Sequence, residues 1–348
     1  MTVRVLELDL PTAKQWCAEL ACNAPVSLSP DFAAVDSHRQ LGLTPHHVGI
    51  ELDGQRWLYS VHCTAFAAGN AIGVISPYGY GGPLVALEDT PQSEWLARVW
   101  QAWSNWCRSR RWLAELARLH PMLPQANWHG GIVTANRDTV MIPLDEELLV
   151  DAGFNSLARR KCRRAMAAGA SIRWSSGLSD WQCFSRFYRE AMQTMCAAPK
   201  YMFSEQYFLA LSQLEGARLC IVSGPLGEMD TWWSAGIYLF GATVAEYHLG
   251  ASTAVGFDHG SPYLMQKAAA EEAKRRHCHS LYLGGGTDTL EENPLLFHKS
   301  CFSTHRRTFH VATAIHDAAA YSVLRAERSH NSGSTPLPVL FDLFEENG

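Results

Sequence analysis

Hydrophobic and polar positions alternate with two different periods along the chain. A period of two predicts strands over residues 3–8, 47–52, 56–63, 71–75, 140–144, 171–174, 218–222, 231–240, 242–251, 280–283 and 307–311. A period of three to four predicts helices over residues 11–22, 30–40, 92–111, 156–168, 180–196, 204–215, 261–276 and 316–325. Because strands and helices mingle in both halves, we predict an α/β or α+β fold with mixed sheets.

Two short sequence motifs predict where particular elements begin or end. Asp53-Gly54 lies between two β-rich runs and predicts a tight hairpin turn. Ser261-Pro262 predicts the start of a helix, because serine caps free backbone N–H groups and proline has none to leave unpaired.

The composition is that of an ordinary globular protein. The chain has 348 residues, of which 47% are hydrophobic and 18% charged, and its net charge is −5. This length fits two domains or one large α/β unit, and the apolar content excludes a disordered chain. The acidic balance argues against a general DNA-binding protein but leaves room for one local basic groove.

The ten cysteines form no Cys-x-x-Cys pair. A zinc ribbon needs such pairs, and a secreted disulfide scaffold is shorter and richer in cysteine, so we expect reduced thiols and no metal. The N-terminus shows no apolar signal segment, and no apolar run approaches the ~18–20 residues that span a bilayer. We therefore expect a cytoplasmic protein without a membrane span.

Ser76–Pro83 is the first segment that can carry chemistry. Three glycines and two prolines in eight residues predict a sharply turned path, which presents Tyr78 and Tyr80. These tyrosines can offer hydroxyl groups and ring faces to a ligand. A tight turn with tyrosines packed on the core is the alternative interpretation.

A basic run begins at Arg159 and places five cations in six positions. On a helix, Arg160, Arg163 and Arg164 share one face. Cations at this density repel each other unless anions neutralise them, so a phosphate-bearing ligand is the predicted counter-ion. A solvated helix face with scattered acidic partners is the alternative.

The third segment contains Gly284, Gly285 and Gly286 at the end of a predicted strand. Glycines there let a ligand approach the backbone, whose N–H groups can bind an oxyanion or a phosphate. Asp288 follows at once, and Lys299 lies a short distance beyond. Neither a P-loop, a Gly-x-Ser-x-Gly elbow nor a Gly-x-Gly-x-x-Gly fingerprint occurs.

Taken in order, these segments resemble the Fem-type aminoacyltransferases, the peptidoglycan-bridge family within the GNAT acyltransferase superfamily. The resemblance covers residues 20–325, and it rests on five matching pieces in the family's order: Ser76–Pro83, the Arg159–Gly169 helix, Tyr247–Ser252, the Ser261–Arg276 helix leading into Leu283–Gly286, and Phe297-His298-Lys299 with Phe302.

The resemblance implies two tandem GNAT-like modules with mixed, mostly antiparallel sheets flanked by helices and a ligand cleft between them. We place the first module at residues 1–150 and the second, with the basic helix and the acyl-transfer site, at residues 151–312. A C-terminal helix and tail at residues 313–348 are expected to pack back on the first module. We expect a monomer.

The resemblance also implies the reaction. Family members move an acyl group, usually an aminoacyl ester of tRNA, to an amine acceptor that often carries phosphates. Lys299 occupies the place of the lysine in the family's Phe-Lys-x-x-Phe-like pattern, from which this sequence departs by inserting His298 after Phe297. Lys299 would then stabilise the oxyanion or neutralise a donor phosphate, assisted by backbone N–H groups of Gly284–Gly286.

Other residues receive roles by the same resemblance. Tyr78, Tyr80 and Tyr247 would shape the cleft, and Arg160, Arg163 and Arg164 would hold phosphates of the acceptor or the donor. The attacking amine must lose a proton, and His248 and Asp288 are the candidates to accept it.

We expect the donor to be aminoacyl-tRNA rather than coenzyme A. The Gln/Arg-x-x-Gly-x-Gly/Ala loop, which binds the pyrophosphate of coenzyme A, has no match in the sequence. Two alternatives stay open: a CoA-dependent N-acyltransferase on the same fold, and a non-catalytic module that binds a phosphorylated ligand. No resident cofactor is expected.

Overall fold

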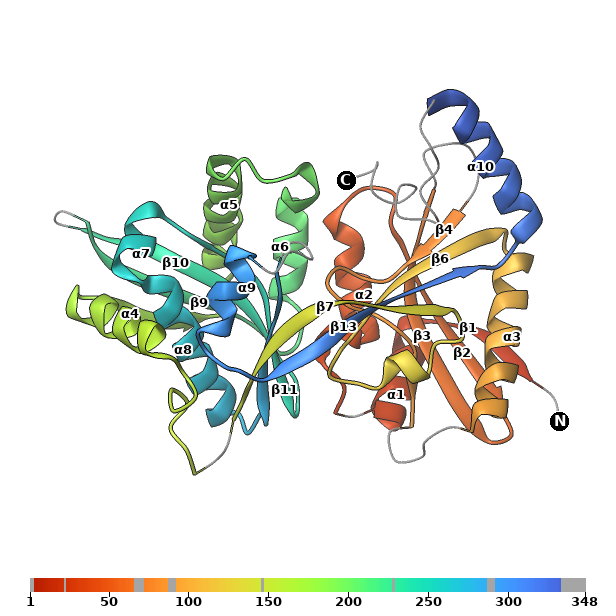
Figure 1. Cartoon of the computed structure of the whole chain (residues 1–348), viewed down its shortest axis with the longest axis horizontal. Coiled ribbons are helices and arrows are strands. Elements are labelled where there is room, and N and C mark those ends of the chain that lie inside the picture. Colours follow the sequence, from red (N-terminus) through yellow and green to blue (C-terminus); the bar gives the residue numbers. More distant parts are fainter. Residues whose placement is uncertain are drawn as a thin grey trace. The chain divides into compact units, whose positions relative to one another are not determined.

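The computed structural model describes residues 3–21, 23–65, 72–86, 92–144, 147–226, 229–286 and 292–332. The chain forms two compact units (Figure 1). Unit 1 comprises Met1–Cys22, Ser27–Asn136 and Phe309–Gly348, and unit 2 comprises Asn23–Val26 and Arg137–Thr308. The chain passes into unit 2 after Asn136 and returns after Thr308, so unit 1 combines strands from distant parts of the chain.

Unit 1 contains a mixed sheet in the order β1-β2-β3-β4-β6-β13, with β5 beside β3. All pairs in it are antiparallel except β4–β6. The strands are β1 (Arg4–Leu8), β2 (Thr44–Leu52), β3 (Gln55–Ala65), β4 (Ile72–Ile75), β5 (Leu84–Val85), β6 (Trp112–Leu119) and β13 (Arg306–Ile315).

Helices cover both faces of the sheet of unit 1. The helices are α1 (Leu10–Ala21), α2 (Pro30–Asp36), α3 (Ser93–Ser109) and α10 (Ala318–Ser332), with short 3₁₀ turns at Val26–Leu28, Ser37–Arg39 and Gln125–Asn127. The apolar stripe of α3 packs on alternate residues of β2 and β3. On the opposite face Gly49 admits the ring of Trp16 of α1, which would lie 2.5 Å from an added Cβ atom.

A buried carboxylate organises the core of unit 1. Glu115 of β6 is fully buried and accepts four hydrogen bonds. The donors are Tyr59 Oη at 2.7 Å, Trp103 Nε1 at 2.9 Å, His129 Nε2 at 2.8 Å and His316 Nε2 at 3.1 Å. Such complete hydrogen bonding is what makes a buried charge tolerable.

The strands of unit 2 follow one another in the order β7-β12-β11-β10-β9-β8. Its pairs are antiparallel except β11–β12. The strands are β7 (Ile132–Pro143), β8 (Ser171–Ser175), β9 (Ala217–Leu226), β10 (Met229–Phe240), β11 (Val244–Ser252) and β12 (Ser280–Gly285).

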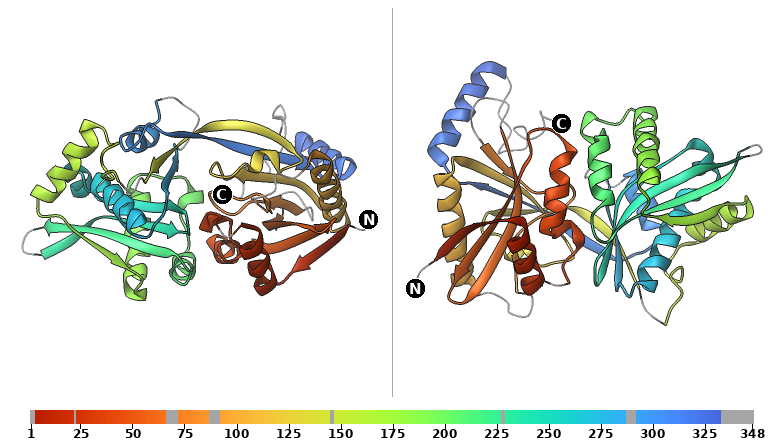
Figure 2. Two further views of the ribbon diagram at one scale, coloured as in Figure 1. Left: turned by 90° about the horizontal axis from the view of Figure 1, so that it is seen from below. Right: turned by 180° about the vertical axis from the view of Figure 1, so that it is seen from behind.

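Helices lie on both faces of this sheet as well. The helices are α4 (Ser156–Ala167), α5 (Leu178–Thr194), α6 (Glu205–Ser212), α7 (Ala254–His259), α8 (Ser261–Arg275) and α9 (Pro294–Ser300), with a 3₁₀ turn at Pro199–Tyr201. The left view of Figure 2 shows α4 and α8 on one side of the strands and the green helices α5 and α6 on the other. The core cluster under α4 and α8 also contains Leu296, Cys301 and Phe302, so α9 belongs to that face.

The structure confirms the mixed α/β class and most predicted elements. The predicted hairpin turn at Asp53-Gly54 is present, with φ of 55° and 80° at the two residues. Three differences stand out: β7 begins at Ile132, well before residue 140, and the helices α7 and α9 were not predicted. No helix among the described residues is long and apolar enough to cross a membrane.

Candidate acyl-transfer site

The candidate site lies in unit 2, where two parallel strands separate. β11 and β12 pair over only three positions, from Val244↔Ser280 to Glu246↔Tyr282. Both strands then continue, β11 to Ser252 and β12 to Gly285. We call the space between them the strand fork. Backbone groups that face it have no ladder partner on that side, so they need another partner or a ligand.

Helix α9 brings a lysine to this fork. Asn293 caps the helix by accepting hydrogen bonds from the backbone N–H groups of Leu295 and Leu296, and Pro294 follows as its first residue. Leu296 and Lys299 are three residues apart and therefore share one face of the helix. That face packs against the sheet, and Lys299 is only 7% exposed.

The amine of Lys299 has few partners. Nζ donates to the carbonyl oxygen of Gly285 at 2.7 Å and lies 5.8 Å from the ring centroid of Tyr247. Gly285 O belongs to the part of β12 beyond the paired positions, so the lysine replaces the missing ladder partner. Burial lowers the pKa of Lys299 to about 7 and raises the pKa of Tyr247.

The three glycines after Leu283 shape the end of β12. Gly284 has φ of 77°, and the register with β7 shifts beside it. An added Cβ at Gly286 would lie 2.5 Å from Cγ and Oδ1 of Asn293, so the helix cap packs directly on this glycine. The glycines therefore allow α9 to approach the strand closely.

His298 takes an unexpected place. Its ring packs against Tyr263 at 4.5 Å and Phe302 at 5.2 Å between ring centroids, whereas Phe297 is 61% exposed. α9 is continuous through Lys299, and His298 rather than Phe297 packs on this aromatic cluster. The insertion of His298 into the family's pattern stays a prediction.

His248 does not lie beside Lys299. The pairing of β10 and β11 skips from Tyr247 to Leu249, which leaves His248 in a bulge. Its Nε2 lies 2.8 Å from the hydroxyl of the fully buried Tyr207 of α6. Tyr247, by contrast, packs against the cluster under α4 and α8. The two neighbours thus face opposite sides of the sheet.

The predicted arginine face is exposed. Arg160, Arg163 and Arg164 all lie on the solvent side of α4, whose buried residues are Ala158, Cys162 and Ala165. No ion pair joins these three arginines to any part of the chain that the structure describes. In contrast, Lys267 of the adjacent α8 is paired with Asp151 at 3.0 Å.

Helix α4 starts beside the end of α9. The backbone N–H of Asn155, the N-cap of α4, donates to the carbonyl of Cys301 at 2.9 Å. Phe154 and Phe302 make an edge contact at 5.1 Å between ring centroids. The arginine face and Lys299 therefore belong to one packed layer of unit 2.

Tyr78 and Tyr80 lie in unit 1, in the loop that follows β4. The N–H of Tyr78 donates to Asp36 Oδ2 at 2.9 Å, and the guanidinium of Arg39 lies 5.6 Å from its ring centroid. The ring of Tyr80 packs on His120 and Phe309. Their place relative to Lys299 stays a prediction.

The loop after β4 continues the hydrogen bonding between the parallel strands β4 and β6. After Ile75 the N–H of Ser76 donates to Leu116 O at 3.1 Å, and the N–H of Gly81 donates to Arg118 O at 2.7 Å. Gly81 then forms a parallel bridge to Leu119. The β4–β6 pair is thus continued by the chain itself, unlike the β11–β12 pair.

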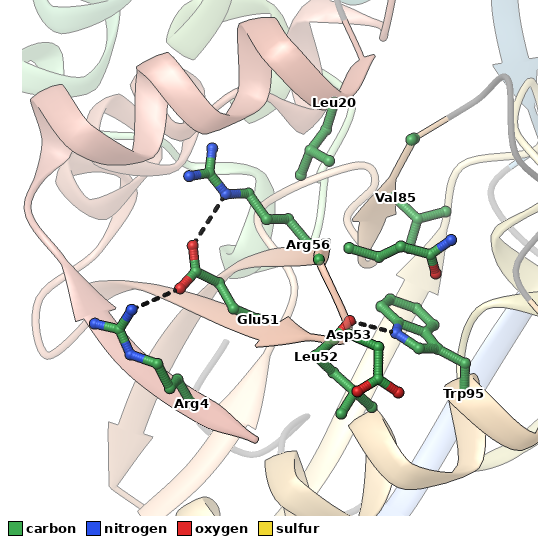
Figure 3. A pocket seen from close by; sticks show the side chains of 11 residues that line it. Arg4, Leu20, Glu51, Leu52, Asp53, Arg56, Val85 and Trp95 are labelled. Atoms are coloured by element: carbon green, nitrogen blue, oxygen red, sulfur yellow. Dashed lines mark hydrogen bonds and ion pairs between the residues drawn. The ribbon is translucent and has the colours of Figure 1, made fainter. Parts of the chain in front are cut away.

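A hollow of about 530 Å³ lies elsewhere in unit 1, beside the Asp53-Gly54 turn (Figure 3). Glu51 accepts from Arg4 at 3.0 Å and from Arg56 at 3.1 Å, and Trp95 Nε1 donates to Leu52 O at 2.9 Å. Because these polar groups already bind one another, the hollow is a weaker candidate than the strand fork.

Two further predictions concern Asp288 and the binding of metal ions. Asp288 lies outside the described residues. Within the described part of the chain, no three His, Cys, Asp or Glu side chains are grouped so that they could hold a metal ion.

Sequence reasoning missed two residues at the fork. Asn293 caps α9, and Arg137 of β7 donates from Nη1 to Gly286 O at 3.1 Å. Asn293-Pro294 carries the same start signal that predicted the Ser261 helix, so the sequence could have revealed it. Nothing in the sequence marks Arg137, because its partner is a backbone carbonyl far along the chain.

Comparison with solved structures identifies the fold. The structure of FemX matches with a TM-score of 0.69 at 12% identity, covering 92% of this chain and 99% of that one. This chain has a Fem-type, tandem GNAT-like fold. No family model matches the chain, and no curated protein matches it either.

Two further structures share the Fem-type fold. A tandem GNAT protein from the clavulanic acid biosynthesis pathway, solved without AcCoA, has a TM-score of 0.54 at 12% identity and covers 90% of this chain and 99% of its own. The C-terminal DUF2156 domain assigned to a lysylphosphatidylglycerol synthetase of Agrobacterium fabrum has a TM-score of 0.55 at 12% identity, with coverage of 95% and 100%. These likenesses confirm the tandem GNAT-like fold predicted from the sequence.

Proposed function

We propose that the protein is an acyltransferase that moves an acyl group, in our preferred version an aminoacyl group from aminoacyl-tRNA, to an amine acceptor. The observation that carries this proposal is the strand fork of unit 2, with the buried amine of Lys299 at its end. The Fem-type fold supports the same reaction class, because its neighbours include a GNAT protein and a synthetase domain whose names denote acyl transfer.

The fork suits attack of an amine on an ester or thioester carbonyl. As the carbonyl carbon becomes tetrahedral, its oxygen gains negative charge and needs hydrogen-bond donors. The N–H groups of Lys299 and backbone N–H groups near Gly284–Gly286 would serve as such donors. Holding both reactants between two strands also reduces the entropic part of the barrier.

The arginine face of α4 supports a phosphorylated reactant. The three arginines are exposed and have no ion-pair partner among the described residues. On a chain of net charge −5 they form a local site for an anion. Because α4 begins at the end of α9, a long reactant bound there can extend toward Lys299. An aminoacyl-tRNA or a phosphorylated amine acceptor has the required charge and length.

The start of α8 argues against coenzyme A as the donor. In CoA-dependent enzymes of this kind, free N–H groups at a helix start bind the pyrophosphate. Here α7 runs directly into α8 at Gly260, whose N–H donates to the carbonyls of Gly256 and Phe257. The second helical residue is Pro262, which has no N–H. Few donors are therefore left for a pyrophosphate.

The first test replaces the lysine. Lys299→Ala should fold normally but slow single-turnover acyl transfer by ~10² or more, because a donor to the developing oxyanion is lost. Wild type is first incubated with a pool of charged tRNAs and a panel of acyl-CoAs, and amide products are read by mass spectrometry. The matched control is Lys200→Ala, which removes an exposed lysine of unit 2.

Each outcome of this test decides between functions. Retained transfer by Lys299→Ala would remove the lysine from the mechanism. Products from acyl-CoAs alone would establish the CoA-dependent alternative. Absence of any product from wild type, with a phosphorylated ligand still bound, would favour the non-catalytic binding module.

The second test concerns the arginine face. Replacing Arg160, Arg163 and Arg164 by alanine should weaken binding of the phosphorylated reactant and reduce its dependence on salt concentration, because fewer counter-ions are displaced. Binding is measured by titration calorimetry at several salt concentrations. Arg186→Ala on α5 serves as control, and an equal loss in that variant would contradict the assignment.

The cleft-shaping roles of Tyr78, Tyr80 and Tyr247 stay predictions, and so does proton acceptance by Asp288. The contact of His248 with Tyr207 argues against proton acceptance by His248.

A further inference from the structure

Among the residues that the structure describes, no carboxylate pairs with the amine of Lys299. Its contacts with the rest of the described chain are the hydrogen bond to Gly285 O at 2.7 Å and the ring of Tyr247 at 5.8 Å. Neither partner is an anion. The side chain is 7% exposed, so water replaces little of what an ion pair would supply.

A buried ammonium group without an anion is unfavourable. Desolvation favours the neutral form of lysine, and an ion pair is the usual compensation. Here burial lowers the pKa of Lys299 to about 7, so the neutral amine is abundant at neutral pH. A neutral amine still donates one N–H to Gly285 O and keeps a lone pair free.

The ionisable groups packed around this amine do not restore its charge. On α9, burial and the charge of Lys299 lower the pKa of His298 to about 4, so that ring is neutral at pH 7. On α8, burial raises the pKa of Tyr263 to about 12. On β11, burial raises the pKa of Tyr247, and on β7 Arg137 adds a second cation at Gly286 O.

We propose that Lys299 is the proton acceptor of the transfer reaction, entering turnover as a neutral amine and deprotonating the ammonium group of the acceptor. This inference rests on the proposed acyl transfer. The geometry favours Lys299 over His248, because His248 faces α6 on the other side of the sheet and its Nε2 is bonded to Tyr207.

The proton and the electron pairs move in a defined order. Lys299–NH₂ takes one proton from the acceptor R–NH₃⁺, which gives R–NH₂ and Lys299–NH₃⁺. The amine lone pair forms the C–N bond, the carbonyl π pair moves to oxygen, and Lys299–NH₃⁺ donates a hydrogen bond to that oxyanion. The bond from carbon to the leaving oxygen or sulfur then breaks, and the leaving atom takes a proton from the new nitrogen. Lys299 finally releases its proton to solvent.

The same side chain thus serves the two roles in sequence. As base it activates the nucleophile, and as the resulting cation it stabilises the intermediate. A group with a pKa near the working pH can do both efficiently.

The first measurement is the titration of Lys299 itself. The chain has six lysines, so a protein labelled with ¹³C at the lysine ε carbons gives a spectrum that can be assigned, with Lys299→Met identifying the signal. We expect the Lys299 signal to titrate near pH 7, well below the ~10.4 of a lysine in a model peptide. A Lys299 midpoint above pH ~9.5 would overturn the proposal.

The second measurement separates a base from a fixed cation. Lys299→Arg keeps a positive charge and N–H donors but cannot accept a proton at neutral pH. We expect its single-turnover rate to fall ~10²-fold or more, as in Lys299→Met, whereas wild type gains rate as pH rises through 7. An arginine variant within tenfold of wild type would show that only the positive charge matters.

The two proposals fail in different ways. A wild-type protein that transfers no acyl group from any donor overturns the proposed function, whatever the titration gives. An active wild type with a normal lysine midpoint overturns the proton-acceptor role alone.

Discussion

Two buried ionisable side chains show opposite solutions to the same physical problem. Glu115 in unit 1 is surrounded by four donors and remains charged inside the protein. Lys299 in unit 2 has one carbonyl partner and an aromatic ring, which leave it poorly stabilised as a cation. The first arrangement is that of a structural residue, whereas burial in the second lowers the pKa of Lys299 to about 7.

Replacing Glu115 should destabilise unit 1. Glu115→Gln keeps the volume but places an amide N–H₂ among groups that already donate, so we expect a loss of about 3 kcal/mol in the free energy of unfolding. Urea unfolding measures it. The exposed Glu190→Gln on α5 removes the same charge and should change stability by about 0.5 kcal/mol or less. Equal effects would contradict the role of the network.

Glu115 also makes the folding stability of the protein depend on pH in acid. Burial alone would raise the pKa of Glu115, but the charges and hydrogen bonds of His129 and His316 outweigh it and hold the pKa well below its usual range. A lowered pKa contributes stability above the unfolded value of ~4.3 and loses it as pH falls toward the folded value. Wild type should therefore lose stability below about pH 4 more steeply than Glu115→Gln.

At the scale of elements, a helix cap and a strand end determine where Lys299 lies. Asn293 holds the start of α9 against Gly286, and Gly285 O receives the lysine at the other end of the helix. The short helix therefore has two anchors on one strand, which limits the freedom of the amine.

A methyl group at this contact should disturb the site. In Gly286→Ala the new Cβ would meet the Asn293 side chain at 2.5 Å, so we expect a loss of about 1–3 kcal/mol and a shift of the Lys299 midpoint toward that of an exposed lysine. Thermal unfolding and the lysine titration measure the two effects. Gly153→Ala is the control, because its nearest atom lies at 3.8 Å.

At the scale of the whole molecule, the two units use one architecture differently. Each contains a parallel pair joined through a helical connection, β4–β6 in unit 1 and β11–β12 in unit 2. Ser76 and Gly81 continue the first pair, whereas the described pairing of the second ends after three positions. The proposed acyl-transfer site lies at this second pair.

This difference predicts the binding stoichiometry. A hydrolysis-resistant analogue of the donor identified by the product screen should bind once per chain, and Lys299→Ala should leave that number at one. Isothermal titration calorimetry measures it. Two equivalent sites per chain would show that the parallel pair of unit 1 also opens.

The sequence by itself determined the fold class and most of the candidate residues. Hydrophobic periods located the long elements, because burial of one face of a helix or strand is a local property of its residues. The ordered set of motifs led to the Fem-type architecture and to Lys299. The short helices α7 and α9 escaped because six or seven residues show too little periodicity, although Asn293-Pro294 did signal the second.

Tertiary structure alone decided which of those residues meet. The bulge in β11 turns His248 away from Lys299, and the loop at Ser76 closes one parallel pair but not the other. Both facts depend on pairing between strands far apart in the chain. The burial that lowers the pKa of Lys299 arises in the same way, because low dielectric surroundings come from neighbours that only the folded chain assembles.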